Sequence, residues 1–189
     1  MLRIVPLTQE LAVMFDKDAR YAMDGDQTCS MQNMNVSCFA AERCIHSHSS
    51  NGGGLKSLLD HGYSFVCMDV TCHPPQFVGC VCASLCPRDV ANRFQPDKRP
   101  DGLVMYSLCV SNRYREQHVG RRLINEVLNV GRKVRLPVFL LVATGHGASS
   151  ECSLAFESRV PNLREMYTHM GWREQCMCED YMLFKYCGD

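Results

Sequence analysis

The stretch from Leu103 to Asn129 constrains the fold most, because it joins an uncharged β-rich run to an amphipathic helix within a few residues. Residues 103–110 are apolar or small and carry no charge, which is typical of a strand buried on both faces. Further along, apolar residues recur at helical spacing. They are Val119, Leu123, Ile124, Val127 and Leu128. The pattern predicts a strand, a tight turn and a helix, as in α/β domains.

The predicted turn suits the binding of an anion. The first turns of a helix present backbone N–H groups that lack an intrahelical partner, at the positive end of the helix dipole. The segment from Arg115 to Arg122 places three arginines around Gly120, whose missing side chain would let a phosphate approach the backbone. An ordinary buried strand followed by a basic amphipathic helix is the alternative interpretation.

This turn resembles the acyl-CoA pyrophosphate loop of the GNAT superfamily of N-acetyltransferases. The family pattern is Arg or Gln, two residues, Gly, one residue, then Gly or Ala, and Arg115 and Gly120 match it. His118 occupies the first glycine position, where a side chain hinders close approach to the backbone unless the backbone keeps a negative φ. The resemblance implies that the pyrophosphate is held by Arg115, Glu116, Gln117, His118, Val119, Gly120, Arg121 and Arg122.

The residues before the turn resemble the end of the family's fourth strand, which splays from the fifth and pairs its backbone with the pantetheine arm. The resemblance implies that the arm lies along Leu108, Cys109 and Val110. The backbone N–H of Cys109 or Val110 would then polarise the thioester carbonyl, a role that requires no particular side chain.

A second match starts at Asn162, where the pattern predicts a helix that ends with Gly171 at the C′ position, followed by Trp172 entering the sheet. It resembles the family's fourth helix, in which a tyrosine lies a turn before a Gly–aromatic pair. Tyr167 has this spacing, and the resemblance implies that it protonates the leaving thiolate. Its unperturbed pKa of about 10 keeps it protonated at neutral pH. The alternative is a half-buried helix aromatic with a hydrogen-bonded hydroxyl.

The general base stays unassigned. Some family members carry a glutamate near the start of strand four, where this chain has Gly102, Leu103 and Val104, with Asp101 just outside. The candidates that remain, directly or through a water chain, are Asp69, His118, His146 and Glu151.

The rest of the chain predicts further strands and helices around this centre. Strands are expected at 2–7, 63–72, 76–86 and 138–143, with one or two more in 176–186, and a helix that Thr8 caps follows the first strand. His73-Pro74-Pro75 cannot continue a ladder, so 63–72 and 76–86 form a hairpin that continues into an antiparallel meander. Short helices are expected at 36–45 and 55–61, a glycine-rich loop at 47–54, an exposed connection at 87–102 and an insertion near the acceptor site at 145–161.

Length and composition favour one domain. With 189 residues, 46% of them hydrophobic, residues 1–189 are expected to form a single α/β domain with a sizeable core. The formal net charge of zero gives no general attraction to nucleic acid or to an acidic membrane surface, and no apolar run approaches the length of a spanning helix. The N-terminal residues do not read as a signal peptide, and the 13 cysteines are expected to be mostly free thiols in the cytosol, or alternatively the nucleus.

Cysteine and histidine raise the question of a metal site, since Cys44, His46 and His48 lie close together and Cys72 and His73 occur elsewhere. Neither C-x2-C nor H-x3-H spacing occurs, so no metal is expected. The pairs Cys80/Cys82 and Cys176/Cys178 place both sulfurs on one face of a strand, as small core residues do. Cys109 as a ping-pong nucleophile lacks an adjacent base.

The resemblance implies an α/β (α+β) GNAT-like domain, with a mixed, mostly antiparallel sheet of six or seven strands, helices on both faces, and strands four and five splayed. The implied function is transfer of an acetyl group from acetyl-CoA, the co-substrate, to a primary amine by direct attack in a ternary complex. The acceptor is a small amine, a polyamine or a protein amine, and the protein is a monomer or a homodimer. One alternative is an acyl-CoA-binding regulatory module without turnover, and another is a Cys/His metal-binding interaction protein.

Overall fold

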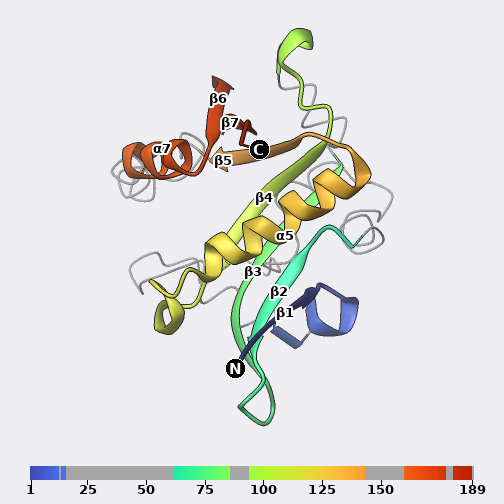
Figure 1. Ribbon diagram of the computed structural model, residues 1–189, viewed down its shortest axis with the longest axis vertical. Coiled ribbons are helices and arrows are strands. Elements are labelled where there is room, and N and C mark those ends of the chain that lie inside the picture. The colour runs from blue at the N-terminus through green and yellow to red at the C-terminus, as the bar shows by residue number, and fades with distance from the viewer. Residues whose placement is uncertain (13, 16–61, 86–93, 144–159, 178–180, 189) are drawn as a thin grey trace, which may run out of the picture. The chain divides into compact units, whose positions relative to one another are not determined.

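The computed structural model describes residues 1–12, 14–15, 62–85, 94–143, 160–177 and 181–188 (Figure 1). The chain divides into two compact units. The first unit comprises Met1–Ser84 and Met105–Val134, and the second comprises Leu85–Val104 and Arg135–Asp189. Each unit is described by itself below. Within the described residues, no helix is both long and apolar enough to span a membrane.

Four neighbouring strands build the first unit. They are β1 (Leu2–Pro6), β2 (Phe65–Asp69), β3 (Gln76–Leu85) and β4 (Leu103–Val110), adjacent in that order. β2 pairs antiparallel with both β1 and β3, which confirms the hairpin predicted around the two prolines. The register of β2 and β3 shifts between Cys67 and Met68, which face Gly79 and Phe77 respectively, so Val78 is an extra residue that bulges β3.

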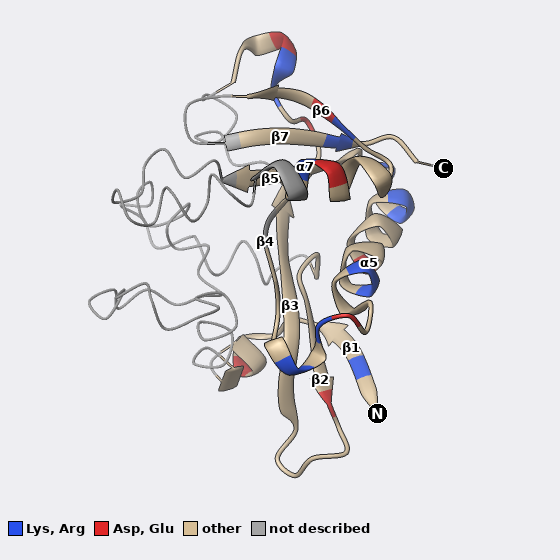
Figure 2. Cartoon of the chain, turned by 90° about the vertical axis from the view of Figure 1, so that its left-hand side faces the viewer, with Lys and Arg blue, Asp and Glu red and all other residues tan. Residues whose placement is uncertain are grey.

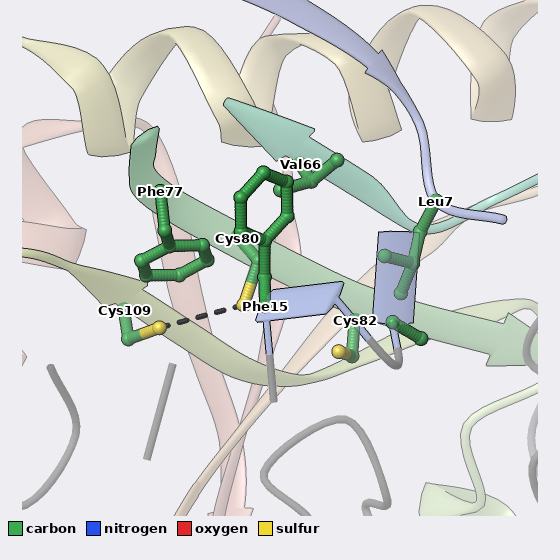
Figure 3. Packing of buried hydrophobic residues seen from close by; sticks show 8 residues of the cluster. Leu7, Phe15, Val66, Phe77, Cys80, Cys82 and Cys109 are labelled. Atoms are coloured by element: carbon green, nitrogen blue, oxygen red, sulfur yellow. Dashed lines mark hydrogen bonds between the residues drawn. The ribbon is translucent and has the colours of Figure 1, made fainter. Parts of the chain in front are cut away.

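One face of these strands is covered by the N-terminal helical turn, residues 9–12 and 14–15. Thr8 caps it as predicted, because its Oγ1 accepts the N–H of Leu11 at 3.3 Å. Figure 3 shows the core beneath the turn, where Phe15 packs with Phe77 and with the thiols of Cys80 and Cys109. Cys80 and Cys82 are both fully buried in this cluster, which confirms that the two sulfurs share one face of the strand.

The other face carries the long helix α5 (Val119–Val134), as the edge-on view in Figure 2 shows. Its buried stripe is the one that the sequence predicts: Val119, Leu123, Ile124, Val127 and Leu128. The helix continues five residues beyond the predicted end at Asn129 and includes Gly131. Gly131 is buried, and packing outweighs the cost of about 1 kcal/mol that glycine has in a helix. Helices therefore lie on both faces of this sheet.

The second unit contains the C-terminal strands and the helix α7 (Val160–His169). The strands are adjacent in the order β5 (Val138–Ala143), β7 (Tyr181–Tyr186) and β6 (Trp172–Met177), and both pairings are antiparallel. The C-terminal region thus holds two strands, and the first begins at Trp172, as the pattern after the helix predicts. The start of β4 also belongs to this unit, where the N–H of Leu103 donates to the carbonyl oxygen of Pro137 at 3.0 Å.

The connection predicted as exposed at 87–102 is only partly so. Its 3₁₀ turn η1 (Pro96–Lys98) is exposed, but Phe94, Pro100 and Gly102 are buried. The prediction failed for these residues because prolines and charges indicate a connection but do not decide which of its residues become buried. The predicted segments 36–45, 47–54 and 55–61, and most of 145–161, lie outside the described residues.

Candidate functional site

The end of β4 and the start of α5 form one packed junction, which confirms the predicted strand, turn and helix. Leu108 and Val110 point to the same side of β4, toward Gly120 in the first turn of α5. A Cβ added to Gly120 would lie 3.7 Å from Val110 Cγ2 and 3.8 Å from Leu108 Cδ2, which are ordinary contacts. The missing side chain of Gly120 therefore faces the strand.

Between strand and helix the chain makes a 3₁₀ turn, η2 (Asn112–Tyr114), and then a second turn at residues 115–118. Glu116 and His118 in this second turn have φ angles of +65° and +58°, and we call residues 115–118 the left-handed turn. The negative φ that would accommodate a side chain at position 118 without strain is therefore not adopted. Histidine is among the side chains that tolerate this region, so His118 takes a conformation that glycine adopts freely.

The left-handed turn leads directly into backbone N–H groups without helical partners. The first intrahelical bond of α5 runs from the N–H of Arg122 to the carbonyl oxygen of His118, at 3.0 Å. The N–H groups of Val119, Gly120 and Arg121 precede it, and they lie at the positive end of the helix dipole. Turns that combine left-handed residues with successive N–H groups form anion-binding concavities.

Exposed arginines flank these N–H groups along the chain. Figure 2 shows basic residues on α5 and on the loop before it. Those next to the turn are Arg113, Arg115, Arg121 and Arg122, all of them exposed. A guanidinium group can bind two phosphate oxygens at once. The arginine side chains can therefore bind the same polyanion as the backbone N–H groups. Glu116, Gln117 and His118 also expose their side chains, whereas Val119 is buried under the helix.

On the opposite face of β4, Cys109 packs in the core. Its Sγ lies 3.4 Å from Cys80 Sγ (Figure 3). The contact with Cys109, together with Cys82 and burial, raises the pKa of the Cys80 thiol. A thiol that stays protonated is no base, so the contact with Cys80 does not activate Cys109 as a nucleophile.

The other predicted catalytic residue, Tyr167, lies on α7 in the second unit and is buried. Gly171 ends this helical segment with a φ of +88°, and its N–H donates to the carbonyl oxygen of Thr168 at 3.0 Å, which confirms the predicted C′ position. Tyr167 is 6% exposed, and its ring centroid lies 6.5 Å from that of Trp172 and 5.9 Å from that of Phe184. The residue is therefore more deeply buried than the half-buried aromatic of the alternative interpretation.

Burial raises the pKa of Tyr167 to about 12. The hydroxyl consequently stays protonated throughout the physiological range and can donate a hydrogen bond to an anion. Arg164, one turn earlier in α7, holds the helix on β6 through a two-pronged ion pair with Glu174, with Nε–Oε2 at 2.8 Å and Nη2–Oε1 at 3.3 Å.

The comparisons with known proteins identify the family. The model of the acetyltransferase (GNAT) family matches residues 30–151, which is more than half of the chain. The chain belongs to the GNAT family of acetyltransferases. No curated protein matches it in sequence.

Solved structures similar to this GNAT chain confirm the predicted fold class. PH1933 from Pyrococcus horikoshii OT3 has a TM-score of 0.63 at 12% identity, and the match covers 100% of this chain and 99% of that one. A GNAT-family acetyltransferase from Listeria monocytogenes has a TM-score of 0.62 at 12% identity, over 97% and 93% of the two chains. NAA60 of Arabidopsis thaliana, in complex with acetyl-CoA, has a TM-score of 0.56 at 17% identity, over 98% and 99%. At these identities the likeness shows the fold, so transfer to an amine stays a prediction.

Sequence reasoning missed two groups that shape this GNAT site. Tyr114 donates a hydrogen bond from its hydroxyl to Asp69 Oδ2, at 3.3 Å, although 45 positions separate them. Gly79 lies so close to β4 that an added Cβ would be 2.6 Å from the Cys109 carbonyl oxygen. No local sequence pattern predicts the bond between Tyr114 and Asp69. A lone glycine inside a strand, in contrast, does indicate the close approach of another backbone.

The general base stays open in this GNAT domain. Gly102, Leu103 and Val104 are buried at the start of β4, and Asp101 is exposed. Asp69 is unsuited to the role, because hydrogen bonds from Thr71 and the amino group of Met1 hold the pKa of its carboxyl well below the usual range. The remaining candidates are His118, exposed in the left-handed turn, and His146 and Glu151, which lie outside the described residues.

The described part of the chain contains no candidate metal site. No group of three or more His, Cys, Asp or Glu side chains there could hold an ion. Cys72 and His73 belong to this part, whereas Cys44, His46, His48 and Cys178 lie outside it.

The ionisation of Asp69 should make the stability of the protein depend on pH. Because its folded-state pKa is lowered, the ionised group stabilises the fold above the unfolded pKa of about 3.9, and this contribution is lost as the pH falls below that value. We expect Asp69→Asn to lower the melting temperature at pH 7, and the difference from wild type to shrink at pH 3. Calorimetric melting at both pH values measures it, and a difference that stays constant would contradict the assignment.

His118 should tolerate glycine and reject a β-branched residue. We expect His118→Val to lower stability by about 1–2 kcal/mol, because a branched side chain is strained at positive φ. His118→Gly should change it by less than about 1 kcal/mol, since the relief of strain and the extra freedom of the unfolded chain offset each other. Gln117→Val is the control, because Gln117 lies between the two left-handed residues without being one. Urea unfolding compares the three, and equal losses at 117 and 118 would rule the strain out.

Proposed function

We propose that this GNAT protein transfers the acetyl group of acetyl-CoA to a primary amine by direct attack in a ternary complex. The observation that carries the proposal is the left-handed turn before α5, with the free N–H groups of its first turn and exposed arginines around them. A pyrophosphate carries the charge that such a turn binds. NAA60, which shares the fold, is solved with acetyl-CoA.

The residues divide the work as follows in this proposal. Residues 115–122 hold the pyrophosphate, and Leu108, Cys109 and Val110 line the pantetheine arm, with a backbone N–H of 109 or 110 polarising the thioester carbonyl. The amine attacks that carbonyl as the C–S bond breaks. Tyr167 acts as the general acid and gives its proton to the departing sulfur, and the attacking nitrogen gives its proton to a base that stays unassigned.

Both classes of acceptor remain in the proposal, a small amine or polyamine and a protein amine. The second candidate function is an acyl-CoA-binding regulator without turnover. It is favoured by the buried apolar start of β4, where no carboxylate can act as the base. The free thiols of Cys67, Cys80, Cys82 and Cys187 support a reducing compartment, the cytosol or the nucleus, as the place of action.

Calorimetric titration with acetyl-CoA, followed in the same sample by chromatographic detection of CoA against polyamines, small amines and lysine peptides, tests the proposal. We expect binding, with CoA release for one amine class. The double variant Arg121→Glu/Arg122→Glu serves as the negative control. It reverses two charges beside the turn and should abolish binding of acetyl-CoA without unfolding the helix. Binding without release favours the regulator, and no binding by the wild type excludes both functions.

A further inference from the structure

The loop that enters the left-handed turn is tied to the sheet at two points. The N–H of Ser111 donates to the carbonyl oxygen of Val78 on β3, at 2.8 Å. Three residues later the hydroxyl of Tyr114 donates to Asp69 Oδ2 at the end of β2, at 3.3 Å. The first tie is made by the main chain, and the second depends on two side chains from distant parts of the sequence.

The acceptor of the second tie is itself held in place. Asp69 Oδ1 accepts the hydroxyl of Thr71 at 2.7 Å and its N–H at 3.0 Å, which leaves Oδ2 turned to Tyr114. Partial burial and the neighbouring Asp69 carboxylate raise the pKa of Tyr114, so its hydroxyl remains a donor. The bond therefore joins a neutral donor to an ionised acceptor, the stronger kind of hydrogen bond.

The turn that follows needs such support. Glu116 and His118 both lie in the left-handed region, which costs a residue with a side chain more than it costs glycine. A loop with two unfavourable residues relaxes to other conformations unless its neighbours hold it. α5 holds its far end, where His118 accepts the first helical bond, and Tyr114 lies just before its near end.

We propose that Tyr114 and Asp69 are positioning residues that preorganise the left-handed turn, and so set the affinity for the pyrophosphate of acetyl-CoA without touching it. This inference rests on the proposed function. When the turn is preformed, binding does not have to include the free-energy cost of ordering it, so the affinity for the ligand is higher. Chemistry at the thioester, which involves other residues, is unaffected once the ligand is bound.

The test compares Tyr114→Phe, which removes only the hydroxyl, with Tyr186→Phe, which removes a hydroxyl from β7 in the second unit. We expect Tyr114→Phe to raise the calorimetric Kd and the KM for acetyl-CoA about 5- to 10-fold, with kcat at saturation within about twofold of wild type. Asp69→Asn should act in the same direction. Tyr186→Phe should leave all three values unchanged.

Adding His118→Gly to Tyr114→Phe separates positioning from contact. Because glycine adopts positive φ freely, the double variant should recover the part of the lost affinity that strain at His118 causes, while Glu116 keeps its own strain. A Tyr114→Phe protein that binds acetyl-CoA as tightly as wild type overturns the inference. So does a loss that His118→Gly does not restore, since the hydroxyl then contacts the ligand itself. Failure of the wild type to bind acetyl-CoA is a different result, which removes the proposed function.

Discussion

Gly79→Ala is expected to lower the stability of the protein by about 2–3 kcal/mol, or roughly 5–10 °C in melting temperature. The new Cβ would lie 2.6 Å from the carbonyl oxygen of Cys109 and 3.2 Å from Val110 Cα. Both are backbone atoms of β4, which cannot rotate away as a flexible side chain can. The methyl group must therefore push β4 away from β3, at the residues proposed to line the pantetheine arm.

Gly120→Ala is the matched control for stability, because it adds the same methyl group against the same strand from the helix side. Its Cβ would make ordinary contacts with Leu108 and Val110, and alanine favours a helix over glycine by up to about 1 kcal/mol. We expect it to be neutral or stabilising. Thermal and urea unfolding compare the two variants. A Gly79→Ala protein as stable as wild type would show that β3 and β4 are not so closely packed there.

Tyr167→Phe is expected to lower kcat by about 10- to 100-fold while leaving the affinity for acetyl-CoA nearly unchanged. Phenylalanine keeps the ring contacts with Trp172 and Phe184, so the fold around α7 should persist. We expect the lower part of the range that general acids span, because a tyrosine with a pKa of about 12 is a weak acid toward a thiolate whose own pKa is about 8.5. Steady-state kinetics with saturating acetyl-CoA measures the effect.

The pH dependence gives a second check on Tyr167. Because burial raises its pKa to about 12, the hydroxyl stays protonated from pH 7 to pH 10, so the ratio of wild-type to Tyr167→Phe kcat should stay constant over that range. Tyr186→Phe controls for the loss of a hydroxyl elsewhere in the same unit, and its kcat should match the wild type. An unchanged kcat in Tyr167→Phe would remove this residue from the mechanism.

Much of the secondary structure could be predicted because its signals are local. Alternating apolar runs and turn residues mark β3, β4 and β5 to within a residue, and helical spacing marks the buried stripe of α5. Gly171 could be assigned as the residue that ends a helical segment, since positive φ favours glycine strongly. The length of α5 was missed, because the apolar stripe read from the sequence ends at Leu128 and no local signal shows that Gly131 is buried.

The candidate site could be predicted as a set of residues, but its conformation could not. The motif identifies 115–122, yet the positive φ of Glu116 and His118 contradicts what their side chains favour. Local preference loses there because β4 and α5 hold both ends of the loop. Likewise, the burial of Tyr167 depends on Phe184, which lies on a different strand.

The sequence by itself determined the family and the order of the elements, and it predicts which residues form the candidate site, because motifs and periodicity are properties of neighbouring positions. Only the tertiary structure decided the left-handed turn, the bond from Tyr114 to Asp69 and the contact of Gly79 with β4. Each of these features either joins residues that are far apart in the chain or requires packing to outweigh the backbone conformation that the residues favour locally. Such contacts depend on how strands and helices pack, which no short stretch of sequence encodes.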